Sequence, residues 1–550
     1  MVTEKVEADV LCAGGGIAGM MAAIRAAELG AKVVVAEKGN TIRSGAGGAG
    51  NDHFACYIPE VHGPNIEPLV RLRLNLRGGL VVSAKTVRSW LERSFDIVKL
   101  WDDWGIPMKY GGKWEFAGQS YPGGTLMALK YQGQKQKPIL SREALNRGAQ
   151  ILNRVMVFDL LGGPEGISGA LGVDTRAGRI VEFRAKSVIL GTGQAGRLYP
   201  GPVHGAPWYT SFPPTLTGDG RAMAYRAGAA LFGLEMEGRH FGPKYFAKQG
   251  QGTWIGVARD ASGNPVGPFV TKPDETCKRY GDSALMRYHD AFENYRKSGK
   301  GPIYMDCRGI SDEDLDYMLH WLRHEGNNAL IKHLEEEGID LRKNAIEFMP
   351  YEMRVSGGVY HNKEAETSVK GLYAAGDETF GGISNAAVYG WIAGENAAAY
   401  AREAAPPREG LVNPALEEKL GLLDEFRSRE LGADWKEVNL ALQQTMRDYV
   451  GEARSQTMLD AGLNHLHRLK RKALSTMIAR NQWELTRCLE VLNLLDLGEL
   501  VFTAARERKE TRARHVRPDF PITDPRLERS ILLIRETDGK PTTEWVQIKD

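Results

Sequence analysis

The N-terminal part of the chain alternates short apolar runs with amphipathic stretches, which is typical of a parallel α/β sheet. Residues 7–13 (EADVLCA) predict a buried strand, residues 20–30 (MMAAIRAAELG) a helix, and residues 32–36 a second strand. Two later apolar runs, at 188–190 and 371–374, end in small residues and predict further buried strands. The α/β domain is therefore expected to be split along the sequence.

The rest of the hydrophobic pattern is mainly helical. Residues 312–338 have helical periodicity, and after a Pro/Gly-rich linker at 403–414 apolar residues recur at i, i+3 and i+4 as far as residue 510. Residues 534–550 are typical of strand or extended chain. These patterns predict an α/β domain in two parts (1–218 and 345–402), an inserted α+β capping domain (219–344) and a C-terminal helical domain (403–550).

Composition and charge mainly exclude functions. A chain of 550 residues is too long for one hydrophobic core, and its formal charge of +2 argues against a nucleic-acid binder. No apolar run reaches the ~18 residues of a membrane span, and the N-terminus shows no signal peptide, so we expect a cytoplasmic protein. The cysteines form no C-x-x-C pair, and no metal site is predicted; they are Cys12, Cys56, Cys277, Cys307 and Cys488.

A glycine motif stands between the first predicted strand and its helix. The run Gly14-Gly15-Gly16-Ile17-Ala18-Gly19 is G-x-G-x-x-G, in which the glycines allow a tight turn, close approach of a pyrophosphate and packing of helix on strand. The helix N-terminus offers free N–H groups to the phosphates. Glu37 ends the second strand, where an acid accepts ribose hydroxyls. The pattern predicts a dinucleotide site.

Two further motifs follow later apolar runs: Gly191-Thr192-Gly193 and Gly376-Asp377-Glu378. They resemble the GTG and GD motifs of flavoproteins with two dinucleotide-binding folds, which implies FAD as the cofactor. Together with Thr217-Gly218-Asp219-Gly220, Ser384-Asn385-Ala386 and the segment 510–521 (ETRARHVRPDFP), they give the chain a resemblance, over most of its length, to the fumarate reductase/succinate dehydrogenase flavoprotein superfamily.

The resemblance implies a Rossmann-like two-dinucleotide-fold FAD-binding domain and a set of cofactor-binding residues. These are Gly14, Gly16, Ile17, Ala18, Gly19, Glu37, Lys38, Arg43, Ser44, Gly45, Gly48, Gly191, Thr192, Gly193, Asp219, Gly376, Asp377, Glu378, Ser384 and Asn385. Members that attach FAD covalently use the histidine of an R-S-H-T-like motif, where this chain has Arg43-Ser44-Gly45-Ala46. FAD is therefore expected to be held non-covalently.

Within the superfamily the chain is most similar to the α subunit of dissimilatory adenylylsulfate reductase. The shared features are R-S-G-A at 43–46, GPIYMD at 301–306, EFMP at 347–350 and MEGRHFGP at 236–243. In that branch electrons pass through a small subunit with two [4Fe–4S] clusters. The resemblance therefore implies a ferredoxin-like [4Fe–4S] partner, and the absence of cysteine motifs here agrees with it.

Two departures bear on the substrate. The histidine and arginine that clamp a dicarboxylate in fumarate reductases fall here at Met353 and near Gly381, which argues against fumarate or succinate because a carboxylate would lack its bidentate partners. In the adenylylsulfate branch an arginine follows F-V-P, whereas Lys244 stands here, with the charge but without the planar fork.

The candidate catalytic residues are His240, Lys244, Arg354 and Trp208. His240 aligns with a histidine that contacts the substrate in fumarate reductases, so it fits a proton donor or a ligand of an anion. The alternative is a partly buried histidine at a domain junction. Lys244 and Arg354 supply positive charge to an anionic substrate or reduced flavin, or are solvated cations. Trp208 and Tyr209 have two interpretations: they stack on the flavin or the substrate, or they pack within the protein. His361 and the charged run from Glu510 to Asp519 have both functional and structural interpretations.

Two functions follow. The first is an FAD-dependent oxidoreductase that moves two electrons between a small anionic substrate, with adenylylsulfate or sulfite as the candidate, and an iron–sulfur partner. The second is an electron-relay flavoprotein subunit with no small substrate; the missing dicarboxylate clamp is compatible with it, whereas a capping domain favours the enzyme. An aspartate-oxidase-like activity is disfavoured by the lost arginine.

Overall fold

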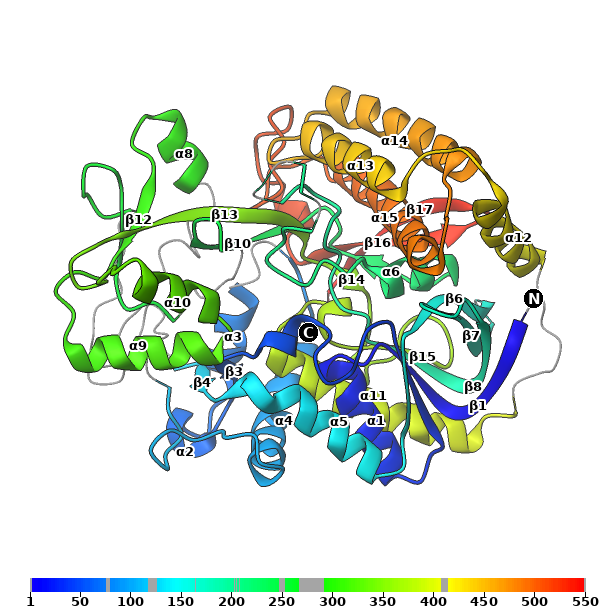
Figure 1. Cartoon of the computed structure of the whole chain (residues 1–550), viewed down its shortest axis with the longest axis horizontal. Coiled ribbons are helices and arrows are strands. Elements are labelled where there is room, and N and C mark those ends of the chain that lie inside the picture. Colours follow the sequence, from blue (N-terminus) through cyan, green and yellow to red (C-terminus); the bar gives the residue numbers. More distant parts are fainter. Residues whose placement is uncertain are drawn as a thin grey trace.

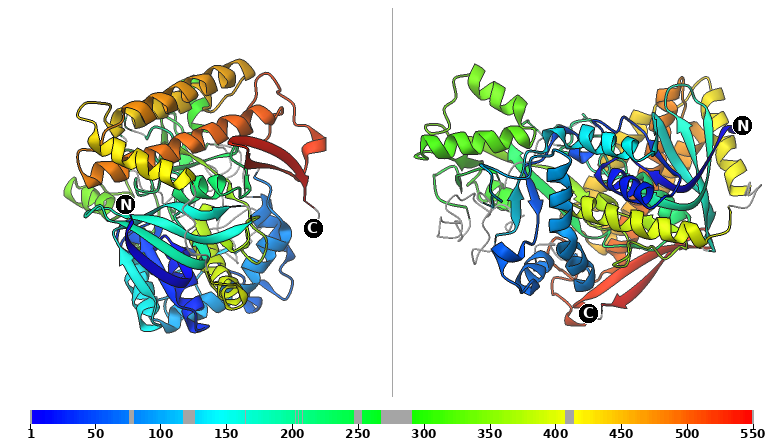
Figure 2. Two further views of the ribbon diagram at one scale, coloured as in Figure 1. Left: turned by 90° about the vertical axis from the view of Figure 1, so that its right-hand side faces the viewer. Right: turned by 90° about the horizontal axis from the view of Figure 1, so that it is seen from below.

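The computed structural model describes residues 2–75, 80–116, 126–163, 165–201, 203, 205–206, 208–246, 253–266, 291–406 and 414–548. Cys277, one of the five cysteines, lies outside these residues. Figures 1 and 2 show a sheet-and-helix body that carries an inserted lobe at one end and a layer of C-terminal helices.

The main sheet has the strand order β5-β2-β1-β8-β7-β6, with β15 also pairing with β8. Strands β5, β2, β1, β8 and β15 run parallel to one another, whereas β7 pairs antiparallel with both β8 and β6. The strands are β1 (Val2–Ala13), β2 (Val33–Glu37), β5 (Gln150–Asn153), β6 (Val155–Gly163), β7 (Gly166–Asp174), β8 (Ile180–Leu190) and β15 (Leu372–Ala374). The predicted α/β sheet is therefore present, and its fifth parallel strand arrives from a distant segment.

Helices α1 (Ile17–Glu28) and α11 (Ile383–Glu403) lie together against this sheet. They approach closely because α11 has a glycine at each crossing point: a Cβ on Gly390 would lie 2.3 Å from the carbonyl oxygen of Ala18, and one on Gly394 2.3 Å from that of Ala22. The other elements of this body are α2 (Pro59–His62), α3 (Glu67–Asn75), α4 (Ala84–Asp103), α5 (Gln136–Asn146), α6 (Asp219–Arg226), β3 (His53–Ala55) and β4 (Ala128–Lys130).

The inserted lobe is built on a second sheet with the order β10-β13-β12-β11. Its elements are β10 (Glu237–Pro243), β11 (Val257–Arg259), α8 (Ala291–Lys297), β12 (Ile303–Asp306), α9 (Asp312–His324), α10 (Asn328–Glu336) and β13 (Ile346–Val355). Strand β13 pairs with both β10 and β12, so the sheet extends past the predicted domain end at residue 344. The sequence pattern predicts no strand over these residues and does not reveal which sheet they join.

The described residues of the C-terminal domain form the helices α12 (Pro414–Ser428), α13 (Trp435–Tyr449), α14 (Gln456–Thr476) and α15 (Gln482–Glu507). Asn481 caps α15 by accepting from the N–H of Glu484 at 3.0 Å. The tail forms the hairpin β16 (Ser530–Thr537) and β17 (Lys540–Gln547), which joins β9 (Leu231–Phe232) and β14 (Gly358–Val359) in a third sheet. None of the described helices is both long enough and apolar enough to span a bilayer.

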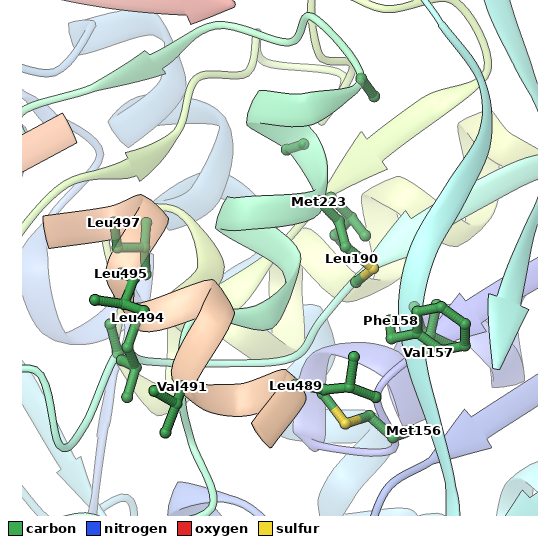
Figure 3. Packing of buried hydrophobic residues seen from close by; sticks show 14 of the residues in the cluster. Met156, Val157, Phe158, Leu190, Met223, Leu489, Val491, Leu494, Leu495 and Leu497 are labelled. Atoms are coloured by element: carbon green, nitrogen blue, oxygen red, sulfur yellow. The ribbon is translucent and has the colours of Figure 1, made fainter. Parts of the chain in front are cut away.

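Helix α15 joins the C-terminal domain to the main body through one apolar cluster and one charged network. Leu489, Val491 and Leu494 belong to the same buried cluster as Met156 of β6 and Leu190 of β8 (Figure 3). The charged network centres on Glu490.

The Glu490 carboxylate is fully buried and forms ion pairs with three cations: Lys38 Nζ at 2.8 Å, Arg197 Nη2 at 2.9 Å and Arg487 Nη1 at 3.0 Å. Lys38 also lies 2.8 Å from the carboxylate of Asp219, at the start of α6. Four separate segments thus meet at one buried group of charges, which is stable only while each charge keeps its partner.

Removing the central charge tests this network. We expect Glu490→Gln to lower the free energy of unfolding of the cofactor-free protein by about 3–5 kcal/mol, because three buried or partly buried cations lose their shared carboxylate. Thermal and denaturant unfolding measure the change. Glu336→Gln, in an exposed pair with Lys332, is the matched control and is expected to change stability by less than about 0.5 kcal/mol. Equal effects of the two variants would contradict the assignment.

Candidate functional site

A cavity of about 540 Å³ lies at the carboxyl ends of the parallel strands. The strand order β5-β2-β1-β8-β15 gives the cavity two ends: Glu37 ends β2 and Lys38 follows it at one end, and Asp377 follows β15 at the other. In open α/β sheets this edge is where ligands bind. The predicted residues that line it are Gly14, Gly16, Ile17, Ala18, Glu37, Lys38, Ser44, Gly45, Gly191, Thr192, Gly193, Trp208, Asp219 and Asp377.

The glycine loop lies directly against the turn after β8. Gly14 has φ = 101°, and a Cβ there would be 2.5 Å from the carbonyl oxygen of Gly191. The Glu37 carboxylate accepts from the N–H of Gly15 at 2.7 Å and from that of Gly39 at 2.6 Å. Glu37 therefore fixes the shape of the loop as well as lining the cavity.

Glu378 and Asp377 have different positions. Glu378 is buried and does not line the cavity; its carboxylate accepts from Thr192 Oγ1 at 2.6 Å and from the N–H groups of Thr192 and Gly193 at 2.8 and 3.2 Å. Burial raises the Glu378 pKa, against the opposing effect of Arg221. Asp377 lines the cavity and accepts from the N–H of Gly382 at 2.9 Å, which holds the start of α11 in place.

Several predicted cofactor residues do not line the cavity. Arg43 is exposed, and the Ser384 hydroxyl is used inside the fold: it donates to the carbonyl of Ala55 at 2.5 Å and accepts from Trp90 Nε1 at 2.9 Å. Gly19, Gly48 and Gly376 act through close backbone packing, and Asn385 is buried within α11. Ser384 and the three glycines therefore belong to the supporting structure, whereas neither amide atom of Asn385 has a hydrogen-bond partner among the described residues.

The four catalytic candidates separate into three places. Lys244 does not line the cavity; its ammonium pairs with Glu347 at 2.7 Å, and this hydrogen bond raises its pKa. Trp208 lines the cavity beside two residues of α15, Trp483 and Arg487. This position is at the β2 end and does not support the predicted catalytic role.

His240 and Arg354 are brought together around Phe212, which the sequence did not single out. The Arg354 guanidinium lies 4.5 Å from the Phe212 ring, and the His240 ring lies 5.7 Å from it. Strands β10 and β13 place them, because Gly238 pairs with Arg354 and the register shifts between Arg239 and Phe241. Burial lowers the Arg354 pKa to about 10, while the charges of Glu352 and Asp377 oppose the shift.

Arg221 of α6 is a second cation at this end that sequence reasoning missed. Its Nη2 donates to the carbonyl of Asp377 at 2.6 Å, and burial lowers its pKa against the charges of Glu378 and Asp377. It directly follows the quoted run 217–220, so extending that motif by one residue would have found it. Trp483 and Arg487 gave no such signal, because their helix is far away in sequence.

The remaining candidates are structural. His515 is buried, accepts from Arg454 Nη1 at 3.3 Å and donates through Nε2 to the carbonyl of Arg508 at 3.0 Å, so it is neutral and its pKa lies well below the ordinary value. The charged run around it is salt-bridged: Glu510 with Arg508 and Arg512, and Arg517 with Asp519. His361 is buried between Phe380 and Tyr389, and burial lowers its pKa to about 4.

One carboxylate and histidine group lies apart from the cavity lining. Asp52, His53 and Glu325 lie close enough to share an ion. However, Lys130 Nζ is 2.6 Å from Asp52 Oδ2 and supplies the positive charge that the buried carboxylate needs. The arrangement is that of an ion pair between the residue before β3 and the end of β4, and Thr253 of the inserted lobe donates to both Asp52 and Glu325, at 2.8 and 3.0 Å.

The fold and the cavity define an FAD-dependent flavoprotein, and the comparisons name its family. A family model described as "FAD binding domain" matches residues 9–388, and one described as "Fumarate reductase flavoprotein C-term" matches residues 439–549. The chain belongs to the FAD-binding family of fumarate reductase flavoproteins and is an FAD-dependent oxidoreductase.

Two curated relatives and one solved structure illustrate the similarity. The chain is 28% identical to one subunit of the fumarate reductase (CoM/CoB) of Methanothermobacter marburgensis, over 98% of this chain and 99% of the relative. It is 28% identical to the L-aspartate oxidase of Vibrio cholerae, over 94% and 96%. The adenylylsulfate reductase of Archaeoglobus fulgidus shares the fold with a TM-score of 0.85 and 23% identity, over 100% of this chain and 97% of that one.

The residues present fit FAD. The N-termini of α1 and α11 both open on the cavity through Gly16 and Gly382, which suits a pyrophosphate at one and the flavin carbonyls at the other. The buried Ser44 hydroxyl lines the cavity and has no hydrogen-bond partner among the described residues. An unpaired buried hydroxyl is costly unless a ligand completes its hydrogen bond.

Acid pH is expected to destabilise the fold. The His361 pKa is depressed to about 4 from 6.5, so between these values the unfolded chain takes up a proton that the native state does not. Stability is therefore lost as pH falls below 6.5, by about 1.4 kcal/mol per pH unit for each such histidine. His515 acts in the same direction.

The variant His361→Phe isolates this contribution. Denaturant unfolding between pH 7.5 and 5 should show a smaller loss of stability on acidification in the variant than in the wild type. His465→Phe, at an exposed position on α14, is the control and should leave the pH dependence unchanged. A pH dependence that is identical in all three proteins would refute the assignment.

Proposed function

We propose that this chain is the flavoprotein subunit of a reductase that exchanges two electrons between a small anionic substrate and a separate iron–sulfur protein. The observation that carries the proposal is Arg354. Its guanidinium makes no ion pair or hydrogen bond within the described part of the chain, although its environment is desolvated enough to lower its pKa. A partly buried cation without a partner is costly, and an anionic ligand supplies the missing partner.

Arg354 does not itself line the cavity, but its charge lies near the end that we propose for the flavin. Asp377 lines that end, and Arg354 lies within electrostatic reach of both Asp377 and Arg221. Arg221 is already bound to the Asp377 carbonyl, so Arg354 is the cation left for a substrate. Phe212 supports its guanidinium from one side and fixes its orientation.

His240 is the proposed proton donor. Its ring packs against the same phenyl group as Arg354, so an anion held by Arg354 would lie near an imidazole that can hold and donate a proton. When bound, FAD supplies the chemistry of accepting and donating an electron pair. The chain's residues bind and orient the anion, hold a proton and, through the inserted lobe, exclude water.

The substrate proposed is an anion such as adenylylsulfate or sulfite. Met353 stands where fumarate reductases have a clamping histidine, and its side chain is buried in the apolar cluster. It offers no hydrogen bond to a carboxylate. One relative is named a fumarate reductase, but Met353 at this position favours a substrate anion that a single guanidinium can bind.

A separate iron–sulfur partner is supported by the cysteines. Cys12, Cys56, Cys307 and Cys488 are buried in different parts of the fold, and burial raises the pKa of each to about 12. These thiols are protonated and separated, so they do not suit a cluster. The Methanothermobacter relative is named as one subunit of its reductase, which agrees with a multi-subunit enzyme. The alternative is a relay subunit without a small substrate.

Photochemically reduced protein, mixed in a stopped-flow spectrometer with adenylylsulfate, fumarate or oxygen, distinguishes the two functions. We expect adenylylsulfate to restore the oxidised flavin spectrum fastest. Arg354→Met is expected to raise the half-saturating concentration at least tenfold, because the charge-assisted hydrogen bonds to the anion are lost.

Lys244→Met is the matched control, because Lys244 is already paired with Glu347 outside the cavity. It is expected to leave the half-saturating concentration unchanged. No reoxidation by any small anion, together with rapid exchange with an iron–sulfur protein, would favour the relay. Equal losses in both variants would refute the role of Arg354.

Non-covalent attachment of FAD is proposed from Gly45, which has no side chain to form the bond. Precipitation of the holoprotein with acid is expected to leave a colourless pellet and release FAD into the supernatant, where its absorbance measures the yield. Flavin that remains in the washed pellet would show covalent attachment. The pellet of a protein known to carry covalent flavin is the positive control.

A further inference from the structure

We propose that the C-terminal helical domain completes the cofactor site, with Trp483 and Arg487 of α15 closing over the adenosine half of FAD together with Trp208. All three side chains line the cavity. Two of them lie beyond residue 388, where the match to the FAD-binding family model ends. The N-terminal domain is therefore incomplete as a binding site.

The strand order identifies this end of the cavity as the adenosine end. Glu37, which ends β2, occupies the position of the acid that contacts a ribose in G-x-G-x-x-G units. The next strand outward from β2 is β5, and Arg154, which follows β5, lines the cavity beyond Glu37. If the ribose of a dinucleotide lies at Glu37 and its flavin near Asp377, its adenine lies on the β5 side of Glu37, beside Arg154.

Helix periodicity explains why α15 can reach the cavity. Trp483, Arg487 and Glu490 are spaced i, i+4 and i+7, so they share one helix face. Glu490 anchors that face to Lys38, which is itself a cavity residue. The buried charge network thus holds the two side chains at the cavity.

The three side chains form one aromatic and cationic group. The Trp208 and Trp483 rings have centroids 6.3 Å apart, and the Arg487 guanidinium lies 5.7 Å from the first ring and 5.5 Å from the second. Trp208 is held from behind by Trp435, at 5.2 Å, and by Arg197. Trp208 is therefore fixed before any ligand arrives.

The exposure of Trp483 points to a missing partner. Its side chain is 51% exposed, although it stands beside a cavity and in an aromatic group. A planar base would cover an exposed indole, and stacking of a base on an aromatic side chain is insensitive to which base it is. Arg487, which is buried and paired with Glu490, holds its guanidinium against both indoles.

Calorimetric titration of the FAD-free protein with FAD, ADP and FMN tests the proposal. ADP carries only the adenosine half with its phosphates, and FMN carries only the flavin half. Trp483→Ala and Trp208→Ala are expected to raise the Kd of FAD and ADP about tenfold or more, and to leave the Kd of FMN unchanged. Trp483→Phe keeps an aromatic face and should lie between wild type and Trp483→Ala.

Trp545→Ala is the matched control, because Trp545 is a partly buried indole that packs on Arg508 and does not line the cavity. Circular dichroism of each FAD-free variant reports on folding. Unchanged Kd values for FAD and ADP in the Trp483 variants would refute the proposal. So would an equal loss for FMN, which would show a general disturbance of the cavity. The test does not depend on the substrate or the partner protein.

Discussion

The buried carboxylate of Glu490 is the constraint on which the rest of the structure depends. It takes charges from the end of β2, from the loop at Arg197 and from its own helix, and through Lys38 it is joined to Asp219 at the start of α6. A buried charge of this kind tolerates few alternative arrangements, because any displaced partner leaves another charge without compensation. The network therefore fixes the C-terminal domain against the sheet edge where the cofactor cavity lies.

The cavity itself is made mainly by backbone. Two helix N-termini and the turns after β1, β8 and β15 present N–H groups and glycines to it, while acids such as Glu37 and Glu378 hold those turns from behind. Such a construction suits a cofactor that is held along its whole length. The side chains then distinguish the two ends: Arg354 lies within electrostatic reach of Asp377, with His240 beside it against Phe212, and the aromatic group lies at the end of β2.

This division between the ends changes the interpretation of two residues. Trp208 belongs with Trp435, Trp483 and Arg487, so its chemistry is that of binding rather than of catalysis. Lys244 is neutralised by Glu347 at the far end of β10. In contrast, Arg354 is the cation proposed to bind the substrate, because Arg221 already donates to the carbonyl of Asp377. The chemistry proposed for the chain thus depends on which cations already have partners.

The sequence by itself determined the local features: the G-x-G-x-x-G turn, the strands that precede it and follow it, the helical C-terminal part and the presence of a dinucleotide site. Each depends on neighbours within a few residues, so periodicity and glycine positions are sufficient to predict it. The sheet that β13 joins, the pairing of β16 with β9 and the approach of α15 to the cavity were decided only by the tertiary structure. These contacts join residues far apart in the chain, and their energies come from packing and charge compensation that no local pattern records.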